Sequence, residues 1–289
     1  MNQPPEISMA APLPCEYVEV PLGDGYPARG RYYAGHQPGR AAVYLHGIQS
    51  HSGWFVRSCD FLRQAGLTVL APDRRGSGMN QADRGHCESA GQLLEDLDRA
   101  VNWLQQRSGA AQVNVVAVSW SGKLALVYAQ QFPAKLRSVI LTAPGLCPKI
   151  DIRLPEKISV GWNGLVHPHK LHTIPLTEPS LFTANPAMLE FLARDPLLLK
   201  EATASFFMAS KKLDFLARQA VGRISVPVYL FLAGQDRIVD NEATVNFLRP
   251  VLGARGEQDF ILYPAAHHTL DFEPDPQGYF ADLATILLA

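Results

Sequence analysis

The sequence VNVVAVSWSG, at residues 113–122, decides the fold of this chain. Its apolar first half predicts a buried strand, and the Ala- and Leu-rich residues 122–131 predict a helix directly after it. A turn that passes straight from strand to helix is sharp, so the residues two before and two after Ser119 must be small. Ala117 and Ser121 meet that requirement. Ser119 is therefore a candidate nucleophile, although a Ser at the end of a strand is more often a helix cap.

Short apolar runs alternate with helical patterns on both sides of this turn. The alternation indicates the α/β class, with a mainly parallel sheet covered by helices. The predicted strands are 41–45, 68–71, 113–118, 138–142, 228–233 and 260–262. The alternation breaks between residues 145 and 226, where prolines and apolar helical segments replace it. We expect a lid (cap) insertion at 145–226 between two parts of one core, 1–144 and 227–289.

The composition fits a globular protein with a large core, because 47% of the 289 residues are hydrophobic and 18% are charged. The formal net charge is -1, so no overall field favours nucleic acid or an anionic membrane as a partner. Residues 1–14 do not resemble a secretion signal, and no run of roughly 18 apolar residues could span a membrane. The four cysteines lack C-x-x-C spacing, which predicts reduced thiols in the cytoplasm. None of these features predicts an oligomeric state.

A second candidate element follows the first predicted strand, where the chain reads His46-Gly47-Ile48. Acyl transfer is helped by two backbone N–H groups that are aimed at one point and stabilise the oxyanion. We predict that the N–H groups of Ile48 and Trp120 form this oxyanion hole. His46 would then anchor the loop, and its use as the catalytic base is the minor alternative.

Candidates for an acid and a base follow the last two predicted strands. The first of these strands ends in a Gly turn that presents Asp236, and the second is followed by the adjacent histidines His267 and His268. The order Ser119, Asp236, His268 is that of the α/β-hydrolase fold. Only one of two neighbouring histidines on a loop can face Ser119, because their side chains point in different directions. Asp240, further into its turn, is the alternative acid.

Several of these segments resemble a known family, the monoacylglycerol lipase/lysophospholipase-like group of the α/β-hydrolase superfamily. HGIQSHSG at 46–53 resembles the group's H-G-x-x-x-H-S-G loop, and APDRRGSG at 71–78 resembles its D-x-x-G-x-G-x-S loop with substitutions. RDPL at 194–197 is the clearest match in the lid. The resemblance implies the α/β-hydrolase fold, with a mainly parallel eight-stranded sheet flanked by helices and an inserted helical lid. The family pattern Y-x-G-A-x-H-x-L, matched at 263–270, assigns the base to His268.

The same resemblance implies a serine hydrolase that needs no cofactor. His268, oriented by Asp236, would take the proton of Ser119, which attacks the carbonyl while the Ile48 and Trp120 N–H groups hold the oxyanion. The expected substrate is a small-molecule carboxylic ester with an apolar acyl group, monoacylglycerol- or lysophospholipid-like. A thioesterase, a proline-type aminopeptidase and a C–C bond hydrolase are alternatives on the same fold. A non-catalytic ligand receptor is the alternative of another class.

The lid contains many apolar side chains, among them Phe206, Phe207 and Met208. Some of these are expected to line an apolar substrate pocket, because the lid must cover the strand ends where the triad lies. The alternative is that they only pack the lid onto the core.

Two further motifs have a plainer interpretation. Three histidines lie on a Pro-rich loop without a carboxylate or Cys partner, so we predict no metal site there. They are His167, His169 and His172. Ser121-Gly122-Lys123 lacks the glycines of a phosphate-binding loop, so Lys123 is expected to be an ordinary helix residue.

Overall fold

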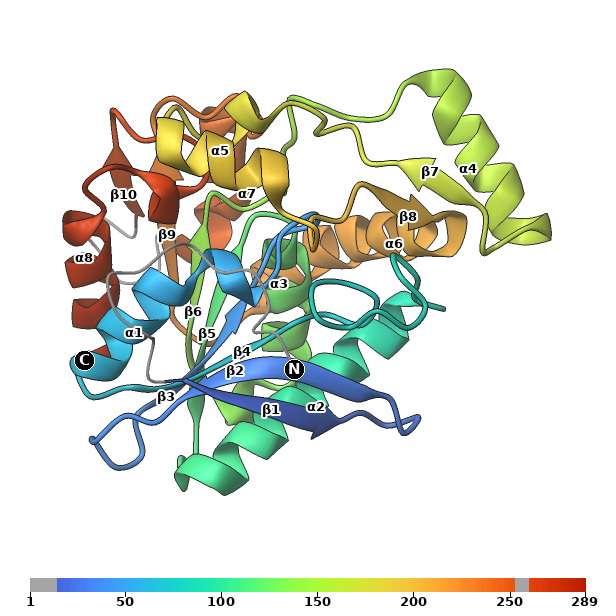
Figure 1. The fold of residues 1–289 in the computed structure, drawn as a ribbon. Helices are drawn as coiled ribbons and strands as arrows, with labels where there is room; N and C mark the ends of the chain where they lie inside the picture. The colour runs from blue at the N-terminus through green and yellow to red at the C-terminus, as the bar shows by residue number, and fades with distance from the viewer. Residues whose placement is uncertain (1–14, 253–259) are drawn as a thin grey trace.

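The core of the protein is an eight-stranded sheet with the order β1-β2-β4-β3-β5-β6-β9-β10 (Figure 1). The computed structural model describes residues 15–252 and 260–289, so the first fourteen residues of the predicted core lie outside it. At one edge, β1 (Glu16–Pro21) and β2 (Pro27–Tyr33) form an antiparallel hairpin, and β2 is also antiparallel to β4.

The other six strands run parallel to one another, which confirms the prediction of a mainly parallel sheet. All six were predicted from the sequence, whereas the edge hairpin was not. They are β4 (Thr68–Pro72), β3 (Ala41–Leu45), β5 (Val113–Val118), β6 (Leu136–Thr142), β9 (Val228–Ala233) and β10 (Phe260–Tyr263).

Helices cover both faces of the sheet, so the central strands are buried. Apolar side chains of α1 (Val56–Gln64) and α8 (Gln277–Leu288) belong to the cluster on one face. The cluster on the other face contains side chains of α2 (Ala90–Ser108), α3 (Ser121–Gln131) and α7 (Asn241–Leu252). Every residue of β3 and β5 is buried as a result. The ends of these two strands are the fixed frame on which the candidate site is built.

The chain between β6 and β9 forms three helices and a two-stranded antiparallel sheet. These elements are α4 (Leu154–Val166), β7 (Leu171–Thr173), α5 (Pro186–Arg194), β8 (Glu201–Thr203) and α6 (Ala204–Ala220). They lie together beyond one end of the large sheet (Figure 1). This segment corresponds to the predicted insertion at 145–226. Its action as a lid stays a prediction.

Helix α4 presents an apolar face to solvent. Leu154, Ile158, Trp162 and Leu165 follow one another at one-turn spacing, and the side chain of Leu165 is 80% exposed. Only the opposite side of the helix packs, through Val160 and Asn163, which are buried. The helix is thus held to the rest of the molecule mainly along α6.

Candidate active site

Ser119 lies in the sharp turn between β5 and α3, as the sequence predicts. Its φ of 55° is in the left-handed region, which is rare outside glycine and costs on the order of 1–3 kcal/mol. Space is tight around the turn, because a Cβ on Gly122 would lie 2.7 Å from Pro144 Cβ. Ser121 ties the turn to the sheet by donating its hydroxyl proton to the carbonyls of Val118 (2.9 Å) and Leu45 (3.1 Å).

Ser119, His268 and Asp236 form a buried hydrogen-bonded chain. The Oγ of Ser119 lies 2.9 Å from Nε2 of His268, and Nδ1 of His268 lies 2.8 Å from Oδ2 of Asp236. The three residues follow β5, β10 and β9, whose carboxyl ends meet at the same edge of the sheet. The arrangement allows the imidazole to accept the serine proton at one nitrogen while the carboxylate holds the other nitrogen.

Asp236 is held in the orientation that this chain of hydrogen bonds requires. Its second oxygen, Oδ1, accepts the backbone N–H groups of Ile238 (2.7 Å) and Val239 (2.9 Å). Burial by itself would raise the pKa of Asp236, but the neighbouring His268 and the hydrogen bonds lower it overall. The carboxylate therefore stays ionised and can stabilise a positive charge that develops on His268.

The alternative acid and base candidates have other partners. His267 turns toward Glu273, whose Oε1 accepts its backbone N–H at 2.7 Å and lies 3.1 Å from its Nδ1. Asp240 accepts the N–H of Ala243 at 3.0 Å and so caps the start of α7. Among the hydrogen bonds of the described residues, neither side chain is bonded to Ser119 or His268.

His46 is an anchor of the loop after β3. Its Nδ1 donates to the Gly47 carbonyl at 2.8 Å, and its Nε2 accepts the backbone N–H of Arg74 at 2.9 Å. Burial lowers the pKa of His46 to about 3, so the ring is neutral at ordinary pH. With both nitrogens occupied, His46 has no free nitrogen with which to act on Ser119.

The two expected oxyanion donors lie beside the nucleophile. Ile48 and Trp120 line the same cleft as Ser119. Within residues 15–252 and 260–289, neither backbone N–H donates a hydrogen bond to a protein acceptor. Two free N–H groups next to a serine are what a carbonyl oxygen needs as it gains negative charge.

The cleft at Ser119 has a volume of about 120 Å³ and is lined by both apolar and charged side chains. Most of its lining is apolar, contributed by Ile48, Trp120, Pro148, Ile150, Ile152, Ile174, Pro175, Leu176, Phe207 and Ile238. The charged residues are Lys123, Asp151, Lys211 and Asp214.

Of the three lid residues suggested as substrate contacts, Phe207 alone lines this cleft. Phe206 stacks on the ring of Trp120 with centroids 5.2 Å apart and is buried behind it. Met208 is 44% exposed and faces α4, where a Cβ on Gly164 would lie 2.7 Å from its Cγ. Phe206 and Met208 therefore do not line this cleft, since consecutive helix residues point in directions about 100° apart, and their part in substrate binding stays a prediction.

Lys123 is not the ordinary helix residue that the sequence suggests. It lies one turn after Ser119 on α3, buried, and its Nζ forms an ion pair with Asp214 of α6. Ser210 Oγ accepts from both Lys123 Nζ (3.4 Å) and Trp120 Nε1 (2.9 Å). Burial lowers the pKa of Lys123, and the Asp214 carboxylate offsets part of this effect. The group ties the inserted segment to α3, the helix that follows the nucleophile.

A buried contact that sequence reasoning missed joins two of the matched motifs. His51, in the loop after β3, places its Nε2 3.0 Å from Oδ2 of Asp195, which also accepts the Trp54 indole N–H at 2.8 Å. Burial would raise the pKa of Asp195, but these two hydrogen bonds lower it overall. The only signal in the sequence was that both HGIQSHSG and RDPL resembled the same family.

The three lid histidines do not form a cluster. His169 stacks on His86 with ring centroids 4.2 Å apart, whereas His172 meets the edge of Phe207. In the described part of the chain, no group of three His, Cys, Asp or Glu side chains is arranged to hold a metal ion. Among the same residues, no helix is both long enough and apolar enough to cross a bilayer.

The fold and the Ser119–His268–Asp236 arrangement define the class of the protein, which is an α/β-hydrolase. The Hydrolase_4 family, described as "Serine aminopeptidase, S33", matches residues 36–275, and the chain belongs to this family. It is a serine hydrolase of the lipase and esterase type, within the group that resembles monoacylglycerol lipases.

Three relatives illustrate this placement. The phospholipase YtpA of Bacillus subtilis is 21% identical, over 84% of this chain and 93% of its own length. A monoacylglycerol lipase of Mycolicibacterium smegmatis is 25% identical, over 87% of this chain and 89% of its own. An uncharacterized Escherichia coli protein, YnbC, is 22% identical over 82% of this chain, which spans only 41% of YnbC.

Solved structures confirm the fold. The crystal structure of the Paleococcus ferrophilus monoacylglycerol lipase has a TM-score of 0.80 at 21% identity, covering 90% of this chain and 98% of that one. A soluble variant of the Saccharomyces cerevisiae monoglyceride lipase, in complex with a substrate analogue, has a TM-score of 0.79 at 19% identity. The second match covers 97% of this chain and 98% of the yeast one.

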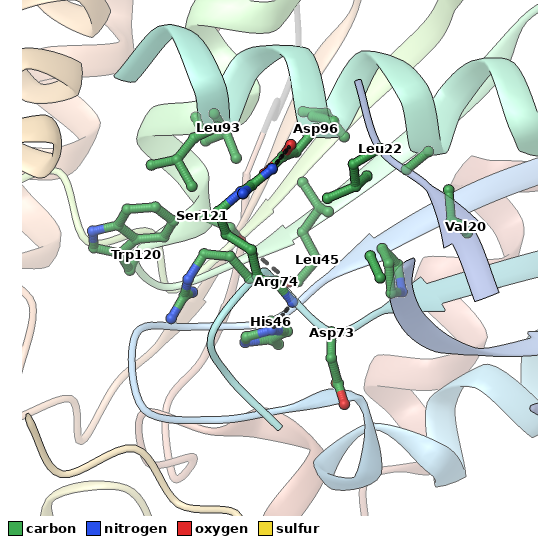
Figure 2. A pocket seen from close by; sticks show the side chains of 16 residues that line it. Val20, Leu22, Leu45, His46, Asp73, Arg74, Leu93, Asp96, Trp120 and Ser121 are labelled. Carbon is green, nitrogen blue, oxygen red and sulfur yellow. Dashed lines mark hydrogen bonds and ion pairs between the residues drawn. The ribbon is translucent and has the colours of Figure 1, made fainter. Parts of the chain in front are cut away.

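A second cavity, of about 50 Å³, adjoins the loop after β3 (Figure 2). Its lining includes His46, Arg74 and Trp120 together with leucines of α2, but not Ser119. It has room for a few water molecules rather than for a substrate. Trp120 lines both this cavity and the cleft at Ser119.

Proposed function

We propose that the protein hydrolyses carboxylic esters with apolar acyl groups, monoacylglycerol- or lysophospholipid-like, through an acyl-enzyme. The observation that carries this proposal is the hydrogen-bonded chain from Asp236 through His268 to Ser119, at 2.8 and 2.9 Å. It opens onto a largely apolar cleft beside two free N–H groups. A ligand receptor would have no need of this arrangement, which supports an enzyme.

Each residue has a defined step in this reaction. His268 takes the Ser119 proton as the hydroxyl oxygen attacks the ester carbonyl, and the N–H groups of Ile48 and Trp120 stabilise the resulting oxyanion. His268 then gives the proton to the leaving alcohol, which departs and leaves the acyl group on Ser119. A water molecule, deprotonated by the same imidazole, attacks the acyl-enzyme and releases the acid. Asp236 stabilises the imidazolium in both halves.

The charges in the cleft favour an ester over an aminopeptidase substrate. An aminopeptidase must bind a protonated amine, which calls for a carboxylate that is not already neutralised. Asp214 pairs with Lys123 and Lys211, and Asp151 pairs with Lys157 at 2.6 Å. Both carboxylates that line the cleft thus already have a lysine partner. Apolar walls instead suit an acyl chain, at roughly 0.8 kcal/mol for each buried CH₂.

A direct comparison of substrates tests the proposal. Purified protein is given p-nitrophenyl esters from acetyl to dodecanoyl, the matching thioesters, 1-monoacylglycerols, lysophosphatidylcholine and a prolyl arylamide. We expect the highest kcat/KM on medium-chain oxygen esters and labelling of Ser119 by a fluorophosphonate probe. Faster cleavage of the arylamide would replace this proposal by an aminopeptidase, and preference for thioesters would replace it by a thioesterase. If the protein is neither labelled nor turns over any substrate, the non-catalytic ligand receptor becomes the remaining alternative.

A further inference from the structure

Arg74 lies in the loop after β4 and reaches across to the loop that contains Ile48. Its Nη1 donates to the carbonyl of Gly47 at 3.0 Å, and its Nη2 donates to the carbonyl of Ile48 at 2.8 Å. The next residue, Arg75, is different, because it pairs with the carboxylates of Asp24 and Asp96. In the described part of the chain, Arg74 makes no ion pair within 4.0 Å. Its guanidinium is therefore committed to backbone carbonyls.

The carbonyl of Gly47 belongs to the same peptide unit as the N–H of Ile48. A peptide unit is planar and trans, so its C=O and N–H point in opposite directions, and holding the oxygen fixes where the N–H points. Two donors hold this oxygen, Arg74 Nη1 at 3.0 Å and His46 Nδ1 at 2.8 Å. Hydrogen bonds to the oxygen of an amide also polarise the unit and strengthen its N–H as a donor.

Arg74 also contacts the side chain of the residue that supplies the other N–H. Its guanidinium carbon lies 4.8 Å from the ring centroid of Trp120 and 5.1 Å from that of Phe206. Figure 2 shows Arg74 alongside Trp120 and near His46. Trp120 is held in turn by Phe206 and Ser210 of α6. The Arg74 guanidinium thus contacts both segments that are expected to supply the oxyanion hole. It donates hydrogen bonds to the carbonyls of Gly47 and Ile48, and it lies against the ring of Trp120.

We infer that Arg74 is a positioning residue that orients the Ile48 N–H and braces Trp120, and so sets the strength of the oxyanion hole. This inference rests on the proposed function, because it assumes that these N–H groups bind an oxyanion. The planar, two-pronged guanidinium is needed, since a lysine ammonium cannot serve two carbonyls and stack on two rings at once. The positive charge behind the hole further favours negative charge on the reacting oxygen.

Substitution of Arg74 separates transition-state effects from binding effects. Arg74→Lys keeps the charge, and Arg74→Met keeps the length without charge. Removing an oxyanion donor outright costs about 10²–10³ in kcat, and misorienting one donor costs less. We expect kcat to fall ~10–100-fold in Arg74→Lys, and more in Arg74→Met, with KM changed less than about threefold, because the acyl chain is bound elsewhere.

A trifluoromethyl ketone with a medium-length chain gives the second readout. It adds to Ser119 as a tetrahedral oxyanion, so its Ki should rise in each variant by the same factor as kcat/KM falls. The matching ether, which has no carbonyl, should bind all variants equally. A merely structural role for Arg74 would instead lower the melting temperature and weaken both ligands together.

Arg84 supplies the matched control. It too donates from its guanidinium to two successive backbone carbonyls, those of Leu197 (2.7 Å) and Leu198 (3.3 Å), but it lies outside the cleft at Ser119. Arg84→Lys should leave kcat and the ketone Ki within about threefold of the parent. If the parent hydrolyses esters and binds the ketone, but Arg74→Lys is unchanged in both, the inference is wrong and the proposed function stands. If the parent itself does neither, the proposed function has failed.

Discussion

The Nε2 of His268 lies 2.9 Å from the Oγ of Ser119, although 149 residues separate the two in the chain. Both side chains are buried, and His268 meets Asp236 on its other nitrogen at 2.8 Å.

Ser119→Ala should lose at least ~10³-fold in kcat/KM and all labelling by a fluorophosphonate, because the attacking atom is gone. Ser121→Ala is the control, since its hydroxyl only bonds the Leu45 and Val118 carbonyls. It should stay within about tenfold of the parent. Kinetics on a p-nitrophenyl ester, with melting temperatures for both variants, give the answer. Equal losses in two well-folded variants would contradict the assignment of the nucleophile.

His268→Ala should lose at least ~10³-fold in turnover, because a triad acts as a unit. His267→Ala should remain within about tenfold, because that side chain turns toward Glu273. Turnover of a p-nitrophenyl ester by both variants measures the difference. A larger loss in His267→Ala than in His268→Ala would remove His268 as the base.

Asp236→Asn should lower kcat by ~10²–10⁴-fold, because the amide keeps the shape but cannot stabilise the imidazolium. In the parent, the pKa of the Asp236 carboxyl is lowered in the folded protein, so this carboxylate keeps its negative charge well into the acid range. Asp240→Asn, which alters only the cap of α7, should keep its activity and change stability by about 1 kcal/mol at most. Comparable kinetic losses in both variants would mean that Asp240 takes part.

Phe207→Ala should shift the preferred acyl length, because Phe207 lines the cleft at Ser119. Each CH₂ buried in the parent contributes up to ~0.8 kcal/mol, or about fourfold in kcat/KM, so acetyl esters should be poor substrates. Met208→Ala is the matched neighbour, since Met208 faces α4. A chain-length profile that moves with Met208 and not with Phe207, or that declines steadily from acetyl upward, would exclude this acyl site.

Asp271→Asn should change how stability depends on pH. Burial raises the pKa of Asp271 to about 7 in the folded protein, where Oδ2 is 3.3 Å from the hydroxyl of Tyr44. The unfolded chain ionises near pH 4, so the folded state binds more protons between about pH 4 and 7, and this residue's contribution to stability falls as the pH rises through that window. Asp271→Asn has no carboxyl to ionise, so it does not lose this stability as the pH rises.

Chemical denaturation at several pH values measures the effect. Asp271→Asn should match the parent near pH 4 and exceed it at pH 7 by up to about 4 kcal/mol, at 1.36 kcal/mol per pKa unit. Ser119→Ala, whose hydroxyl does not titrate in this range, serves as the reference for a change elsewhere in the core. A constant difference between Asp271→Asn and the parent at every pH would show that the pKa of Asp271 is the same in the folded and unfolded states, and so is not raised by burial.

Much of the fold and the order of the site residues could be predicted from the sequence. Almost continuous apolar runs such as 113–118, in which Asn114 is the one polar residue, predict strands buried on both faces, because a parallel sheet covered by helices exposes neither side to water. The small residues around Ser119 report a turn that has no room for larger ones. These are local constraints, and each is written in neighbouring residues.

Contacts between distant segments were decided only in three dimensions. His267 and His268 are the same residue type, and only the path of the loop after β10 sends one to Ser119 and the other to Glu273. The sequence around Lys123 does not indicate an ion pair, which forms only because the folded chain places Asp214 of α6 beside Lys123. The edge hairpin, β1 and β2, was missed because its alternating, partly exposed strands give a weaker apolar signal than the buried ones.

The loop after β3 shows both sides of this division. Its sequence was enough to place Ile48 in this loop, as the expected donor of a backbone N–H, because the motif after a buried strand sets where the loop begins. The sequence did not reveal that Arg74 holds the carbonyls of Gly47 and Ile48, or that Asp195 holds His51. The local sequence pattern determines which residues lie at a strand end. The packing of distant segments determines which donors hold those residues in place, because hydrogen bonds require a geometry that neighbours in the chain do not specify.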